Sequence, residues 1–371
     1  MSEIVQNTLY LLTPGSFIAR DHLTLQIEVP VYPPDLPEDK RDRQSAIEMR
    51  KLSIPIHHLE SVCVFGASTM TGPALGLCWD NGVAVNYLTE NGYLQARLTG
   101  VADTSVLLRR AQFRAADSVE KSAAIAQRIV AGKIQNSRNS LLRAARESES
   151  PDERQCLEST AEALARQLRL LASPIVADAA ASCRHPLDPV RGVEGAAAED
   201  YFSTFNLLLK QQREEFVYSN RSRRPPRDRI NCLLSFLYAL VRHDCVAALT
   251  AIGLDPFVGF LHTDRPNRPS LALDLLEEFR PWLADRLAVT LINRQQISAQ
   301  HFREHAGGAV ELSDAGRKLV IQSYQERKKE TLGHALLGQQ LRIGQLPFVR
   351  ARILARHLRG DIPHYTPFIP K

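Results

Sequence analysis

The stretch from residue 229 to residue 253 reads RINCLLSFLYALVRHDCVAALTAIG and decides the fold of the second half of the chain. Its apolar side chains recur at three- and four-residue spacing, which predicts a buried helix over Arg229–Gly253. Gly253 is a stop signal, and Asp255-Pro256 then supplies an N-cap and a first helical position. We therefore expect a helical core in this part of the chain.

Helical periodicity continues on both sides of this stretch. We predict further helices over Val119–Val130, Pro151–Ala172, Val193–Tyr218, Leu271–Asn293, Asp314–Arg327 and Pro347–Arg359. The last segment, Gly360–Lys371, contains three prolines and predicts an extended tail.

The first hundred residues have a different pattern, with short runs of apolar and β-branched residues between Gly-, Pro- and Asn-rich breaks. A Pro-rich, charged segment, Pro30–Arg50, predicts an exposed loop or hairpin tip. The fold class is thus α+β: a small β-rich, sandwich-like domain over residues 1–102, then a larger all-α domain over residues 103–371. The predicted strands are Thr8–Thr13, His22–Val29, Leu52–His57, Ser61–Phe65, Gly82–Leu88 and Tyr93–Leu98, with a short helix at Thr71–Trp79.

Composition narrows the class of protein. The chain has 371 residues, of which 44% are hydrophobic and 23% charged, the balance of a soluble globular protein. Its 46 basic and 41 acidic residues leave a mild net charge of +5, which permits a basic patch for phosphates. The six cysteines form no CxxC pair, so we expect reduced thiols in a cytoplasmic protein, not a zinc site. No apolar stretch reaches the roughly 20 residues that span a bilayer, and we expect no membrane contact.

Three places in the helical half carry side chains suited to chemistry. Glu194 lies beside small residues, His262 ends an apolar stretch, and Asp274 and Glu277 share a helix face with Glu278 next to them. Each also has an ordinary interpretation: a solvated Glu on a packed helix, a capping His and a solvated acidic face. Carboxylates clustered among apolar residues repel one another, and a divalent cation would relieve that repulsion.

Arginines gather in two loops and on the last predicted helix, where they could follow a phosphate backbone or form a solvated face. No phosphate-binding GxxxxGK[ST] loop, GxSxG elbow or HExxH helix is present. The candidate phosphate-binding residues are Arg223, Arg224, Arg227, Arg265 and Arg268, and the second basic group comprises Arg350, Arg352, Arg356, His357 and Arg359.

Three segments together resemble a known family. Residues 193–197 (VEGAA), 227–238 (RDRINCLLSFLY) and 259–281, which contain GFLH and SLALDLLEEFRP, resemble the CRISPR-associated adaptation integrase, the universal core protein that inserts spacers. The segment from Lys133 to Arg143 is similar as well, and the overall sequence is most similar to the subtype I-C branch.

The resemblance implies a catalytic helical domain and a β domain that pairs two chains into a homodimer. It implies that Glu194, His262 and Glu277 hold Mg²⁺ or Mn²⁺, with Asp274 as a supporting acid and Glu278 as a less suitable ligand. It further implies double-stranded DNA as substrate: the 3′-hydroxyl of a spacer fragment attacks a phosphodiester of a CRISPR repeat. Two homodimers would flank a dimer of a small ferredoxin-like CRISPR-associated protein, forming a heterohexamer in the prokaryotic cytoplasm.

Two other functions fit the same residues. A structure-selective nuclease acting on branched DNA repair intermediates would use the same site. In a non-catalytic DNA-binding scaffold, the acidic residues would be structural only.

Overall fold

The computed structural model describes residues 8–33, 36–37, 41–59, 61–89, 94–98, 106–173, 187–334 and 337–370. The chain divides into two compact units, and each is described by itself. The first comprises residues 1–103 and 312–326, and the second comprises residues 104–311 and 327–371. The predicted boundary, between residues 102 and 103, lies outside the described residues.

The first unit contains two four-stranded sheets. The first sheet has the order β1-β5-β7-β8, with β1, β5 and β7 parallel and β8 antiparallel to β7. The second has the order β4-β3-β2-β6 and is antiparallel except for the pair β2 and β6. The strands are β1 (Thr8–Leu11), β2 (Phe17–Asp21), β3 (Thr24–Val31), β4 (Glu48–Pro55), β5 (Ser61–Phe65), β6 (Thr69–Met70), β7 (Ala84–Leu88) and β8 (Leu94–Leu98).

Both sheets contribute to one apolar core. Buried side chains such as Ile27 and Val62 come from the two sheets, and Leu77 comes from the helix α1 (Gly72–Asp80). Thr71 caps α1, since its hydroxyl accepts a hydrogen bond from Ala74 N. The predicted two-part fold, β-rich and then helical, is confirmed.

Local details of the strands differ from the prediction. The expected strand His22–Val29 is the second arm of a hairpin, because His22 adopts a φ of 51° and turns the chain between β2 and β3. The expected end of Leu52–His57 is a 3₁₀ turn over Ile56–His58. Strands β3 and β4 also extend into both ends of the predicted loop Pro30–Arg50.

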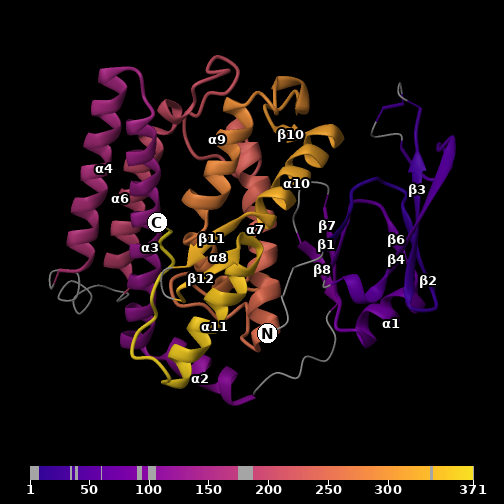
Figure 1. Ribbon diagram of the computed structural model, residues 1–371, viewed down its shortest axis with the longest axis horizontal. Coiled ribbons are helices and arrows are strands. Elements are labelled where there is room, and N and C mark those ends of the chain that lie inside the picture. Colours follow the sequence, from indigo (N-terminus) through magenta and orange to yellow (C-terminus); the bar gives the residue numbers. More distant parts are fainter. Residues whose placement is uncertain are drawn as a thin grey trace. The chain divides into compact units, whose positions relative to one another are not determined.

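The second unit is built around α7 (Arg229–Ile252), which packs against α8 and α11, while α3, α4 and α6 pack against one another (Figure 1). The helices are α2 (Val106–Asp117), α3 (Val119–Arg146), α4 (Pro151–Leu171), α6 (Asp188–Ser203), α7, α8 (Ser270–Glu277), α9 (Arg286–Asn293), α10 (Asp314–Lys329) and α11 (Leu346–Arg359). Shorter turns cover Phe205–Leu208, Arg280–Asp285, Ala299–His301 and Ile343–Gln345. Helix α10 belongs to the first unit up to Glu326.

Among the described residues, α7 is the one helix that is long and apolar enough to cross a membrane. The expectation that no segment reaches this length was therefore wrong. In the structure 78% of its most apolar window is buried inside the protein, as is typical of the central helix of a packed core.

One predicted helix ends earlier than expected because of tertiary contacts, and another is interrupted at a proline. Val193–Tyr218 stops at Ser203, since the chain turns back to stack the Tyr218 ring on Phe202, with centroids 5.1 Å apart. Leu271–Asn293 is interrupted by a π-helical segment over Arg280–Asp285, where Pro281 has no N–H to donate.

Other helices and the tail also depart from the prediction. Val119–Val130 is only the first part of α3. The expected all-α region also contains two short two-stranded sheets. The tail has no regular structure from Asp361 to Pro370, as predicted, but Tyr365 and Phe368 are buried within it. The additional strands are β9 (Phe302–Glu304), β10 (Val310–Leu312), β11 (Thr331–His334) and β12 (Gln339–Arg342).

Candidate active site

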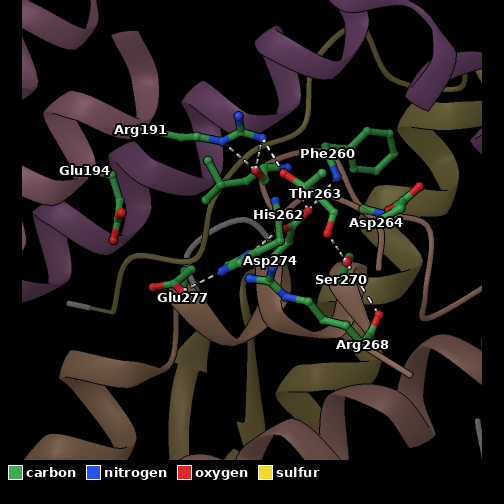
Figure 2. Close-up of polar contacts among 12 residues, drawn as sticks. Arg191, Glu194, Phe260, His262, Thr263, Asp264, Arg268, Ser270, Asp274 and Glu277 are labelled. Carbon is green, nitrogen blue, oxygen red and sulfur yellow. Dashed lines mark hydrogen bonds and ion pairs between the residues drawn. The ribbon is translucent and has the colours of Figure 1, made fainter. Parts of the chain in front are cut away.

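The loop before α8 wraps around one buried carboxylate. Asp274 is fully buried, and its Oδ2 accepts hydrogen bonds from Phe260 N at 2.6 Å and Leu261 N at 3.0 Å. Its Oδ1 accepts a third from His262 N at 2.9 Å (Figure 2). Since a buried charge must be compensated by hydrogen bonds or ion pairs, these donors fix the loop on α8.

The same carboxylate orients the imidazole. His262 Nδ1 lies 2.7 Å from Asp274 Oδ1. An ionised carboxylate only accepts hydrogen bonds, so Nδ1 carries the proton. The other ring nitrogen, Nε2, faces Glu277 and lies 3.7 Å from its Oε1 (Figure 2). This is the arrangement in which a histidine presents Nε2 to a metal.

Close packing holds the loop from both sides. A Cβ on Gly259 would lie 2.9 Å from Ser270 C and 3.0 Å from Asp274 Oδ2, so only glycine fits there. On the other side, Arg191 Nη2 donates to Leu261 O at 2.9 Å. The glycine in the sequence GFLH thus serves a close approach of two backbones.

Two glutamates from different helices meet at one lysine. Glu194 lies on α6, and Glu277 is the last residue of α8. Lys133, on α3, forms an ion pair with Glu194 Oε1, and its Nζ lies 2.8 Å from Glu277 Oε2. The structure therefore connects Glu194 to Glu277 through Lys133 and places Glu277 beside His262.

The positive charges around Glu277 stabilise the ionised form of its carboxyl group. Burial by itself would raise the pKa of this carboxyl, but the positive charges of Arg280 and Lys133 outweigh it, and His262 adds to their effect. As a result, the pKa of Glu277 falls to about 2. Arg280 Nη2 lies 3.1 Å from Glu277 Oε1, one helical turn further along the chain.

The donor set fits a divalent cation in its chemistry. Two carboxylates and one imidazole nitrogen suit Mn²⁺ and Mg²⁺. Glu277 Oε2 is buried, and apart from the Lys133 ammonium at 2.8 Å no described residue donates a hydrogen bond to it. The ligands do not yet surround a common point: within the described ranges, no three His, Cys, Asp or Glu side chains are grouped closely enough to hold a metal ion.

Glu278, the substitute ligand considered from the sequence, faces away from this cluster into a separate network. Arg350 Nε lies 3.1 Å from its Oε2, the Tyr365 hydroxyl donates to Oε1 at 2.5 Å, and Phe368 N donates to Oε2 at 2.8 Å. Arg350 is only 1% exposed, so this member of the second basic group does not lie on a phosphate-binding surface.

Some of the candidate DNA-binding arginines lie near one another. Burial and the positive charge of Arg265 lower the pKa of Arg268, and Arg223 and Arg191 add to this effect, while Asp274 opposes it. A site of concentrated positive charge attracts phosphates. Arg223, Arg224, Arg227 and Arg265 are exposed, and Arg268 is half-buried.

A cavity of about 470 Å³ opens beside Glu194. Lys133 and Glu194 line one part of it, and Arg280 and Asp285 line another. Burial raises the pKa of Asp285 to about 6, although the Tyr238 hydroxyl donates to it at 2.6 Å and Arg280 opposes the rise.

No motif in the sequence predicts a role for four residues of this region: Lys133, Arg191, Arg280 and Asp285. A signal was present for Lys133, because Ile125, Ile129 and Lys133 follow each other at four-residue spacing on the buried face of α3. A lysine within an apolar stripe indicates a buried cation with a partner. Arg191, Arg280 and Asp285 have no such local signal.

Sequence comparisons with known proteins cover most or nearly all of the chain. The family model described as CRISPR associated protein Cas1 matches residues 9–326. A CRISPR-associated endonuclease Cas1 of Moorella thermoacetica is 42% identical over 367 residues, which cover 99% of each chain. A protein of the same name from Chlorobaculum tepidum is 40% identical over 363 residues, 98% of each chain.

Solved structures share the fold. A Cas1 protein from Thermotoga maritima has a TM-score of 0.75 at 24% identity, and the likeness covers 98% of this chain and 100% of that chain. A casposase bound to its integration product has a TM-score of 0.79 at 21% identity, covering 97% of this chain and 93% of that chain. From the family model and the full-length relatives we conclude that this chain belongs to the Cas1 family of CRISPR-associated proteins.

Proposed function

We propose that this protein is a metal-dependent DNA integrase and endonuclease that inserts spacer DNA into a CRISPR array. One observation carries the proposal: Asp274 holds His262 so that its Nε2 faces Glu277, and Lys133 connects Glu277 to Glu194. Potential ligands from distant parts of the chain are thereby linked to one another, and one of them, Glu194, lines a cavity together with Arg221, Arg223 and Arg280.

In the proposed reaction, the 3′-hydroxyl oxygen of a spacer strand attacks a phosphorus atom of the repeat. A new phosphodiester bond forms, an old one breaks, and the proton of the attacking hydroxyl is balanced by the one that the leaving oxygen takes up. Mg²⁺ or Mn²⁺ held by Glu194, His262 and Glu277 would supply a Lewis acid that favours the attacking alkoxide and offsets charge on the phosphoryl group.

Side chains of this protein have separate tasks in that reaction. Asp274 is a positioning residue, since it fixes both the loop and the imidazole of His262. Arg280 balances the buried charge of Glu277. Arg223, Arg224, Arg227, Arg265 and Arg268 bind backbone phosphates and place the DNA without reading its bases.

We also propose the assembly and setting that the family resemblance suggests. The β-rich unit joins two chains into a homodimer, and two homodimers bind a dimer of a small ferredoxin-like partner in the cytoplasm. A structural neighbour with a TM-score of 0.75 belongs to a Cas6-RT-Cas1–Cas2 complex, which supports a partner of the Cas2 type. Within the family, we assign the chain to the subtype I-C branch.

The test is a joining assay with the full-length protein, with and without its small partner. A labelled duplex with a 3′-hydroxyl and a repeat-bearing plasmid are incubated in Mn²⁺, Mg²⁺ or a chelator. We expect joined product only with metal, and a loss of at least about a thousandfold in Glu277→Gln, since metal stabilisation of the transition state contributes several kcal/mol. Glu162→Gln, an exposed glutamate on α4, is the matched control and should retain full activity.

The outcomes separate the three functions. Cleavage of branched DNA without any joining would indicate the structure-selective nuclease. DNA binding without cleavage or joining would indicate a scaffold. Equal joining in the chelator, or in Glu277→Gln, would refute the proposed metal site.

A further inference from the structure

Lys133 lies between two carboxylates that need a cation, at a buried position where an ammonium loses hydration. Its side chain is 11% exposed, on the face of α3 that also buries Ile129 and Ile134. An ammonium in such a position loses most of its hydration, so it requires anionic partners. The sequence supplies them from two other helices.

The ammonium is shared by two carboxylates. Lys133 forms an ion pair with Glu194 on α6, and its Nζ lies 2.8 Å from Glu277 Oε2 at the end of α8. The Lys133 ammonium is the partner of Oε2, since no other described residue donates a hydrogen bond to this buried oxygen. One positive charge thus holds two negative charges together, and it occupies the Glu277 oxygen that a metal would bind.

These two carboxylates are also the anionic ligands of the proposed metal. A divalent cation and the ammonium would seek the same oxygens, and like charges cannot share so small a space. We propose that Lys133 is an internal counter-ion: its ammonium bridges Glu194 and Glu277 in the metal-free protein, and a divalent cation binds these carboxylates by displacing it. This inference rests on the proposed function, because it takes both glutamates as ligands.

The structure gives the displaced side chain somewhere to go. Lys133 and Glu199 both line the cavity of about 470 Å³, so a carboxylate borders the space that the lysine can enter. Lysine has a flexible four-carbon stem and a compact charge, so it can change partners without moving α3. The exchange keeps Glu194 and Glu277 compensated in both states.

A binding measurement on the full-length protein tests the exchange. Mn²⁺ affinity is measured in the absence of DNA by following free Mn²⁺ with electron paramagnetic resonance, and thermal unfolding is followed in EDTA and in Mn²⁺. In Lys133→Met we expect an affinity at least about tenfold tighter than that of the unsubstituted protein, because an internal competitor weakens apparent affinity by the fraction of sites it occupies. The melting temperature should fall in EDTA, and the rise on adding Mn²⁺ should be larger.

Lys328→Met is the matched control. Lys328 is a second buried lysine, and its Nζ lies 2.8 Å from Asp244 Oδ2. Its loss should lower the melting temperature and leave the Mn²⁺ affinity unchanged. Lys133→Arg keeps a positive charge and should restore stability in EDTA.

A second measurement uses the protein without substitutions, in case Lys133→Met does not fold. Reductive methylation with formaldehyde, read by peptide mass spectrometry, reports the reactivity of each lysine. Lys133 should be protected in EDTA and become more reactive in Mn²⁺, while exposed Lys121 stays constant. No rise in reactivity, or an unchanged or weaker Mn²⁺ affinity in a folded Lys133→Met protein, would overturn the inference.

Failure of this inference is distinguishable from failure of the proposed function. If Glu277→Gln abolishes Mn²⁺ binding while Lys133→Met leaves it unchanged, the ligands are right and only the counter-ion role is wrong. If the unsubstituted protein binds no Mn²⁺, or Glu277→Gln binds it equally well, the metal site and the inference fall together.

Discussion

Glu277 and Glu278 are neighbours in the sequence, and both are buried, yet they serve different regions of the molecule. The carboxylate of Glu278 is saturated. It has the charge of Arg350 at 3.1 Å, and it accepts hydrogen bonds from the Tyr365 hydroxyl and from Phe368 N. Every one of these partners comes from the C-terminal part of the chain, so this glutamate anchors the tail.

Glu277 has charges near it but fewer hydrogen bonds. Lys133 and Arg280 compensate it, while apart from the Lys133 ammonium no described residue donates a hydrogen bond to its Oε2. The difference teaches what distinguishes a structural carboxylate from one suited to bind a ligand. A saturated acceptor stabilises the fold, whereas a compensated but unsaturated one can exchange its partner for a metal.

The largest effect should come from removing the charge of each glutamate in turn. Glu278→Gln leaves Arg350 buried without its anion, so we expect a loss of about 3–5 kcal/mol in the free energy of unfolding. The stabilisation by Mn²⁺ should persist. In Glu277→Gln we expect a smaller loss of stability, because Glu194 still pairs with Lys133, and no stabilisation by Mn²⁺.

Chemical unfolding with and without Mn²⁺ measures both quantities for the two variants. Loss of the response to Mn²⁺ in a folded Glu278→Gln protein would contradict the assignment of Glu278 to the tail and not to the metal site. A Glu277→Gln protein that kept the response would contradict the role of Glu277 as a metal ligand.

A middle-sized effect should appear in the pH dependence of Asp285, which shares Arg280 with Glu277. Burial raises the folded-state pKa of Asp285 from 3.8 to about 6. Its contribution to stability is therefore fully present below pH 3.8 and is lost as the pH rises to about 6. With about 1.4 kcal/mol for each pKa unit, the loss amounts to about 3 kcal/mol.

Asp285→Asn does not titrate, so the free energy of unfolding of this variant, relative to the unsubstituted protein, should rise between pH 4 and pH 7. Urea unfolding at both pH values measures the difference. If this difference stays constant or falls, Arg280 compensates Asp285 more strongly than it compensates Glu277. The contrast between the Glu277 and Glu278 regions would then be weaker.

The smallest effect is expected for Asp274→Asn, which tests whether the orientation of the His262 imidazole contributes to metal binding beside Glu277. The amide cannot accept all four donors that reach Asp274, and it loses the charge that orients His262. We expect Mn²⁺ affinity to weaken by about 10–100-fold. Titration with Mn²⁺ in the absence of DNA measures it.

Asp264→Asn is the control, since Asp264 is exposed on the same loop and accepts one long hydrogen bond, 3.3 Å, from Gly259 N. Equal losses in the two variants would indicate that loop order matters and that the bond to the imidazole does not.

Much of the fold follows from local patterns. The stripe of α7, its αL C-cap at Gly253 and the Ser150 and Asp228 caps of α4 and α7 agree with short-range rules. Those rules failed where distant residues intervened. The pairing of Asn206 with the Tyr218 backbone ends the predicted helix Val193–Tyr218, and no local window contains that contact.

The candidate site divides in the same way. Glu194, His262 and Glu277 are predicted through a resemblance of three segments, and the structure links Glu277 to the other two, to His262 directly and to Glu194 through Lys133. Lys133 was visible only as a lysine within an apolar stripe. Arg350 was misjudged as a surface cation, because its helix does carry exposed basic residues such as Arg352 and Arg356.

Short-range patterns in the sequence predict most of the helices, several of the strands and the segments that carry the acids and the histidine, because helix periodicity and caps depend on residues a few positions apart. Only the tertiary structure decided which of two adjacent glutamates faces Lys133 and which faces Arg350. Successive side chains on a helix point about 100° apart, so Glu277 and Glu278 meet different neighbours. Those neighbours lie far away in the sequence, and packing alone brings their charges within reach.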